Sequence, residues 1–109
     1  MCKDHYELRF LSLFKEELER NVSYIAFELC DVEAATRLLN EVETAILKRM
    51  DDGPEMFEVV RSRKERKYPY YRIYVRNYVI YYVVYEENGN KVMEVRRFLH
   101  AKENRGIKI

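Results

Sequence analysis

The feature that most constrains this chain is a change in hydrophobic spacing at Asp52-Gly53-Pro54. Before this point apolar residues recur every three or four positions, which places them along one side of a helix. After Pro69 the chain is dense in tyrosine and valine, two residue types that favour strands. Glycine can take the left-handed conformation that ends a helix, and proline cannot continue one. The chain therefore predicts a helical layer followed by a sheet.

The part before the glycine predicts one strand and two helices. Residues 6–11 alternate apolar and polar side chains, as a strand with one covered face does. Ser12 is the candidate N-cap of a helix over about residues 13–29, and Asp31 that of a second helix. The two expected buried stripes are Phe14, Leu18, Val22, Ile25, Leu29 and Val32, Ala35, Leu38, Leu39, Val42, Ala45, Ile46, Met50. The helices should form an antiparallel hairpin.

The part after Pro69 predicts a three-stranded meander over residues 70–75, 78–85 and 92–99. Asn88-Gly89 is the clearest turn signal, because both residues tolerate the positive φ of a tight hairpin turn. The predicted order is β-α-α-β-β-β. This predicts a single domain over residues 1–109, of the two-layer α+β class, with the helices on one face and the first strand at an edge or in the middle of the sheet.

Charge divides the chain in two. Residues 1–60 carry 7 Lys and Arg against 14 Asp and Glu, whereas residues 61–109 carry 13 against 5. Such segregation favours a surface that meets a polyanion or an acidic partner. The alternative is internal, with an acidic helical layer packed on a basic sheet.

Several classes of protein are disfavoured by composition. No apolar run reaches the roughly 20 residues of a membrane span, and the charged start lacks the apolar stretch of a signal peptide. Cys2 and Cys30 are too few and too isolated for a disulfide framework or a cysteine-rich zinc site. We expect a cytoplasmic protein with reduced thiols and with neither metal nor cofactor.

Four segments resemble the RelE/ParE superfamily of bacterial type II toxins: residues 23–26, 32–39, 75–82 and 96–100. The similarity extends from residue 6 to about residue 105 and agrees with the predicted order of elements. The resemblance implies a small toxin that inhibits growth and is neutralised by a cognate antitoxin, whose disordered segment wraps the toxin and folds on binding. It also implies that operator DNA is reached only through the antitoxin.

One branch of the family cleaves messenger RNA on the ribosome. That branch implies catalytic roles for Arg72, Arg97, His100 and Lys102 in this chain, with cations stabilising the charged transition state and an acid protonating the leaving oxygen. The pattern also expects a second cation on the second strand, an arginine on the third strand and a tyrosine near the end. The first two places hold Tyr74 and Val79, and no tyrosine follows Tyr85.

The ParE-like branch is similar to this chain in the uncharged run 78–82 and in the ending Leu99-His100-Ala101-Lys102. It implies poisoning of DNA gyrase through a protein–protein contact, without catalytic residues, and is our leading interpretation. The alternative is a ribosome-dependent endoribonuclease, which would be an enzyme. A third is a decayed toxin that serves only in an antitoxin complex regulating its own operon.

Cations of the basic half are the candidate contacts to antitoxin or target. They are Arg61, Arg63, Lys64, Arg72, Arg76, Arg96, Arg97 and Lys102. We expect the antitoxin at a sheet edge near residues 92–99 and along the exposed sides of residues 61–76. His100 could equally be a strand-end histidine that bonds backbone. Most of the eight tyrosines in residues 68–85 are expected to pack in the sheet and core, although a platform for stacking bases is the alternative.

Overall fold

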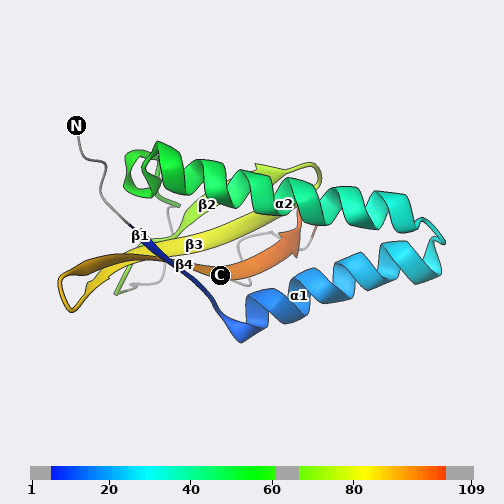
Figure 1. Cartoon of the computed structure of the whole chain (residues 1–109), viewed down its shortest axis with the longest axis horizontal. Coiled ribbons are helices and arrows are strands. Elements are labelled where there is room, and N and C mark those ends of the chain that lie inside the picture. Colours follow the sequence, from blue (N-terminus) through cyan, green and yellow to red (C-terminus); the bar gives the residue numbers. More distant parts are fainter. Residues whose placement is uncertain (1–5, 61–66, 103–109) are drawn as a thin grey trace.

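The structure is a computed structural model, and it describes residues 6–60 and 67–102. Helices lie on one side of a twisted sheet (Figure 1). In chain order the elements are β1 (Tyr6–Phe10), α1 (Ser12–Ser23), the π-helical turn η1 (Tyr24–Glu28), α2 (Val32–Asp52), the 3-10 turn η2 (Pro54–Met56), β2 (Tyr71–Val75), β3 (Tyr78–Glu87) and β4 (Asn90–His100). The predicted α+β class and the order β-α-α-β-β-β are confirmed.

The sheet has the strand order β1-β4-β3-β2. β1 runs parallel to β4, with Tyr6 opposite Lys91 and Phe10 opposite Val95. The other two pairs are antiparallel. β1 and β2 are therefore the edges. The expectation of a sheet edge along residues 92–99 is wrong, because β1 pairs with residues 91–95 of β4 and Glu17 of α1 bonds Arg97 and Phe98 beyond them.

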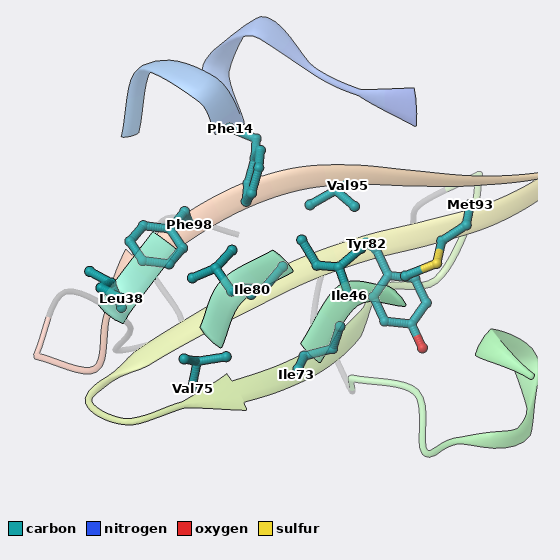
Figure 2. Close-up of a cluster of buried hydrophobic side chains, with 11 residues drawn as sticks. Phe14, Leu38, Ile46, Ile73, Val75, Ile80, Tyr82, Met93, Val95 and Phe98 are labelled. Carbon is teal, nitrogen blue, oxygen red and sulfur yellow. The ribbon is translucent and has the colours of Figure 1, made fainter. Parts of the chain in front are cut away.

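The main core lies between the helices and the sheet (Figure 2). Phe14 enters it from α1, and every strand of the meander contributes side chains to it. Its buried members are Phe14, Leu38, Val42, Ile46, Ile73, Val75, Ile80, Tyr82, Met93, Val95 and Phe98. Each such side chain contributes about 1.5–3 kcal/mol on burial, so this layer accounts for much of the fold's stability.

The opposite face of the sheet is covered too. Tyr81 is only 2% exposed there and packs with Val79 and Leu99 beneath Val60 and Tyr70. The backbone N–H of Val60 donates to the carbonyl of Tyr70 over 2.6 Å, which holds this covering segment along the start of β2. The expectation that most tyrosines pack in the sheet is confirmed for Tyr81 and Tyr82, whereas Tyr74 is 64% exposed.

Two predicted helix caps have different outcomes. The side chain of Asp31 accepts the backbone N–H of Ala34 over 3.0 Å, which confirms the cap of α2. The prediction that Ser12 caps α1 is wrong. The N-cap is Leu11, without a side-chain bond, because its N–H still donates to the carbonyl of Val95 in continuation of β1. The strand thus runs directly into the helix, and Ser12 becomes the first helical residue.

The end of the first helix also differs from the prediction. The α-helix ends at Ser23 and continues as the π turn η1, and Cys30 takes a left-handed φ of 52° in the link to α2. Leu29 and Val32 are 57% and 65% exposed although they were expected in the buried stripes of the two helices. The reason is visible in Figure 1: the helical hairpin projects beyond the end of the sheet, so its far end has no sheet to pack on.

The other turns agree with the predictions from the sequence. Gly53 ends α2 with a φ of 99°, and Asn88 and Gly89 have φ values of 54° and 81° in the β3–β4 hairpin. These are the conformations that the two signals predicted. Among the helices of the described ranges, none has the length and hydropathy that a bilayer span requires.

Candidate functional site

A buried ion pair joins α1 to β4. Glu17 is 5% exposed, and its carboxylate accepts two bonds from the guanidinium of Arg97, at 3.0 Å and 2.7 Å. The same carboxylate accepts the backbone N–H of Phe98 over 3.0 Å. A charge this deep in the protein is tolerated because both a cation and hydrogen-bond donors meet it.

A β-bulge positions this pair. Tyr81 lies opposite Arg97 but Tyr82 lies opposite Val95, so Arg96 is an extra residue in β4. A bulge leaves the ladder locally unpaired and re-aims the side chains around it. The N–H of Phe98 finds its partner in Glu17 at this place. The predicted site residue Arg97 is therefore engaged inside the fold.

Two other predicted cations are also paired. Arg76, in the turn between β2 and β3, makes a bidentate contact of 2.5 Å and 2.7 Å with Glu41 of α2. The guanidinium of Arg76 lowers the pKa of the Glu41 carboxyl below its ordinary value. Arg96 donates to Glu94 over 2.7 Å. The Arg76–Glu41 contact supports the internal interpretation of the charge segregation, in which an acidic helical layer packs on a basic sheet. The Arg96–Glu94 contact lies within β4 and does not bear on it.

His100 and Lys102 lie at the end of β4. The Nδ1 atom of His100 accepts the backbone N–H of Lys102 over 3.1 Å. The imidazole also meets the ring of Tyr78 edge-on, with 5.3 Å between ring centroids. This is the arrangement of a strand-end histidine that bonds backbone. The side chain of Lys102 is exposed.

Arg72 and His100 extend to opposite faces of the sheet. Tyr71 and Ile73 belong to the helix-facing core, so alternation along β2 directs Arg72 to the other face. Leu99 packs on that other face, so the next residue, His100, extends to the helix side. The guanidinium of Arg72 lies 5.7 Å from the centroid of the Tyr74 ring. Arg61, Arg63 and Lys64 lie outside the described residues.

Arg49 and Tyr82 form a polar contact that the sequence analysis did not predict. The guanidinium of Arg49 lies 3.6 Å from the centroid of the Phe57 ring and donates to the Tyr82 hydroxyl over 3.0 Å. That hydroxyl donates in turn to the carbonyl of Pro54 over 2.7 Å. Burial raises the pKa of Tyr82 to about 12. The contact ties the end of α2 to the middle of the sheet.

Glu17 was missed as well, although the sequence carries a signal for it. It lies three residues after Phe14, next to Leu18, and therefore on the buried side of α1. A carboxylate on a buried stripe needs a partner, and a cation elsewhere in the chain is the expected one.

An apolar groove of about 410 Å³ opens between α1, α2 and β1. The groove carries Lys15, Asn40 and Glu43 among otherwise apolar side chains. Those apolar side chains are Leu8, Phe10, Phe14, Leu18, Leu39, Val42, Ile46 and Leu47. β1 pairs with β4 on one side only, and within the described residues no strand lies on its other side. The groove and this edge together form a surface that suits an extended or helical segment of a partner.

Comparison with known protein families identifies the family of this chain. Residues 8–105 match the family described as "ParE toxin of type II toxin-antitoxin system, parDE". The chain belongs to the ParE toxin family. It is thus the toxin of a type II toxin-antitoxin system, and the family implies a cognate antitoxin as its partner. None of the curated proteins matches its sequence.

Among the residues that the structure describes, no three His, Cys, Asp or Glu side chains are grouped so that they could hold an ion. Cys30 is exposed and donates from its Sγ to the carbonyl of Phe27 over 3.5 Å. What the described surface offers instead is an apolar groove, an open strand edge and a few exposed cations.

Proposed function

We propose that this ParE toxin inhibits growth by binding and poisoning DNA gyrase, and that it does so without cutting RNA. The observation that carries the proposal is the placement of the cations expected for RNA cleavage. Arg97 is held by buried Glu17, and Arg72 and His100 extend to opposite faces. Cleavage needs several cations aimed at one developing charge. Binding needs a surface and no such convergence.

We further propose that the antitoxin occupies the groove between α1, α2 and β1. An amphipathic helix would bury its apolar side against Leu39 and Leu47, which are 42% and 44% exposed. Lys15 and Glu43 would meet its polar margins. A second segment could extend the sheet by pairing with β1.

The predicted contact cations divide by exposure. Lys102 is exposed, and Arg76 is exposed while bonded to Glu41. Both are proposed to meet acidic residues of the antitoxin or the target. The same contact is proposed for Arg61, Arg63 and Lys64, which lie outside the described residues. Arg72 is half-buried beside Tyr74. Arg96 and Arg97 would reach a partner only by leaving the carboxylates that hold them.

The activity is tested with purified gyrase and with cells that express the toxin. We expect the wild-type toxin to trap cleaved DNA on gyrase and to cause DNA damage and filamentation, while an abundant messenger RNA stays intact. His100→Ala should retain all of these effects, since the residue plays no catalytic part in gyrase poisoning. Message cleavage in phase with codons, lost in His100→Ala, would make this toxin an endoribonuclease. An absence of any phenotype would indicate a decayed toxin that serves only in an antitoxin complex.

The antitoxin site is tested with a matched pair of substitutions. Leu39→Asp places a charge in the groove and should weaken antitoxin binding about tenfold or more, which corresponds to about 1.4 kcal/mol. Leu13→Asp is the control, because Leu13 is similarly exposed at 40% but does not line the groove. Equal affinities of the two variants, measured by calorimetry, would place the antitoxin elsewhere.

A further inference from the structure

We propose that the far end of the helical hairpin, residues 24–33, is the surface that docks on a basic protein surface of the toxin's target. We call this segment the hairpin tip. The proposal rests on the proposed function, in which the toxin acts by binding its target.

Four large apolar side chains are exposed at the hairpin tip. Tyr24, Phe27, Leu29 and Val32 are 56%, 75%, 57% and 65% exposed. Single apolar side chains on a surface are ordinary, but large ones clustered within nine residues mark a surface that another molecule covers. Phe27 is the most exposed of these four. Burying a phenylalanine stabilises a protein by about 1.5–3 kcal/mol, and this one stays in water.

The geometry of the tip explains why the chain itself leaves it uncovered. Figure 1 shows the ends of α1 and α2 extending past the sheet. The N–H of Leu29 donates to the carbonyl of Tyr24 over 3.1 Å, five residues back, as in a π-helix. This wider turn moves Leu29 away from the stripe that starts at Phe14. π turns are rare and occur frequently at functional sites.

Charge indicates the chemistry of the partner. The tip contains three carboxylates, Glu28, Asp31 and Glu33, and no Lys or Arg. Glu28 lies between Phe27 and Leu29 in the sequence, Glu33 follows Val32, and both are exposed. A second copy of the toxin docking through the same patch would bring these carboxylates together, which is unfavourable. A partner with an apolar pocket and a rim of Lys or Arg is complementary in both respects.

The tip is distinct from the proposed antitoxin groove. None of the residues 24–33 lines the groove, whose lining from α2 begins only at Leu39. The effect of a substitution at the tip can therefore be distinguished from an effect on antitoxin binding in the groove.

The experiment measures the affinity of purified DNA gyrase for wild-type toxin and four variants, alongside the trapping of cleaved DNA. Phe27→Ser should weaken binding about tenfold or more. Glu28→Lys should slow association and reduce its dependence on salt, because steering charges act on the on-rate. The controls are Met56→Ser, at a residue 82% exposed, and Glu86→Lys, in the β3–β4 hairpin at the other end of the molecule in Figure 1. Both controls should match the wild type.

Each outcome has a separate meaning. If wild-type toxin and Met56→Ser bind gyrase and Phe27→Ser has lost affinity, the result supports the tip as the docking surface. Equal binding of wild type and Phe27→Ser would overturn the tip while the proposed function stands. Failure of wild-type toxin to bind gyrase would overturn the proposed function and the tip with it. Thermal unfolding of each variant verifies that the substitutions, all at exposed positions, leave the fold intact.

Discussion

Two of the ion pairs between the helical layer and the sheet differ in their surroundings far more than in their geometry. Arg97 and Glu17 join β4 to α1, and Arg76 and Glu41 join the β2–β3 turn to α2. Both guanidinium groups hold their carboxylate through two nitrogens. The side chains of the first pair are 18% and 7% exposed, and those of the second 49% and 41%.

This difference decides what each pair does. When the second pair separates, water solvates the two exposed charges and replaces most of the attraction between them. The net contribution of this pair to stability is therefore small. Separating the first pair would leave a carboxylate in the interior, where an uncompensated charge is expensive. The α1–β4 contact therefore requires the buried pair, whereas the exposed pair can be broken with little loss of stability.

The largest expected effect comes from breaking the buried pair. Arg97→Ala should lower the free energy of unfolding by about 3–5 kcal/mol, because it leaves the buried Glu17 carboxylate without its cation. Urea unfolding followed by circular dichroism measures the loss. A toxin lost from cells expressing this variant would then reflect unfolding rather than a missing catalytic group.

A second substitution tests whether the buried charge is the cause. Adding Glu17→Gln to Arg97→Ala removes the charge but keeps an oxygen that can accept from Phe98. Part of the lost stability should return. A double variant no more stable than Arg97→Ala would show that packing around Arg97, and not charge, accounts for the loss.

An intermediate effect is expected at a buried contact without an ion pair. Tyr82→Phe removes the hydroxyl between Arg49 and the carbonyl of Pro54, and should cost about 1–2 kcal/mol in urea unfolding. A loss of stability as large as that of Arg97→Ala would mean that burial, and not charge, determines how much each contact contributes to the free energy of unfolding.

The same hydroxyl predicts a dependence on alkaline pH. Burial raises the pKa of Tyr82 to about 12, against an ordinary value near 10, so the native state favours the neutral phenol. Its stabilisation is complete below pH of about 10 and decreases as pH rises towards about 12. The decrease should be smaller in Tyr82→Phe. It should not vanish, because burial also raises the pKa of Tyr71 and Tyr85.

The smallest effect is expected at the exposed pair. Arg76→Ala should reduce the melting temperature only slightly, and the reduction should disappear in high salt, which screens exposed charges. Arg76 lowers the pKa of Glu41, so the contribution of the pair is present above the ordinary pKa of Glu and is lost as pH falls through the lowered value. Wild type and Arg76→Ala should therefore converge in acid. A large loss that is insensitive to salt would contradict the comparison.

Prediction from sequence succeeded where the signal is local. The cap at Asp31, the stop at Gly53 and the turn at Asn88 and Gly89 depend on residues next to one another, and all three are confirmed. Ser12 failed for the opposite reason: the bond from Leu11 to Val95 involves a strand far along the chain, and it extends β1 up to the helix. The stripe of the first helix failed at Leu29, where the π turn and the end of the sheet intervene. The stripe of the second helix failed at Val32 and Leu39, which are 65% and 42% exposed.

The candidate site was less predictable than the fold. The sequence identified Arg72, Arg97 and His100 as side chains able to act on a phosphate, because residue type alone carries that information. It could not indicate that Arg97 is bound by a carboxylate 80 residues away, or that a bulge precedes His100. Those facts depend on the register between strands.

The sequence by itself determined the order of the elements, the turns and the family, because hydrophobic period and turn chemistry act over a few residues. The tertiary structure alone decided which cations are committed to the interior and which apolar side chains stay in water. Both depend on how α1 packs against β4 and on how far the hairpin extends past the sheet. Contacts between distant segments set the free energy of a buried charge or an exposed ring, and no short stretch of sequence contains them.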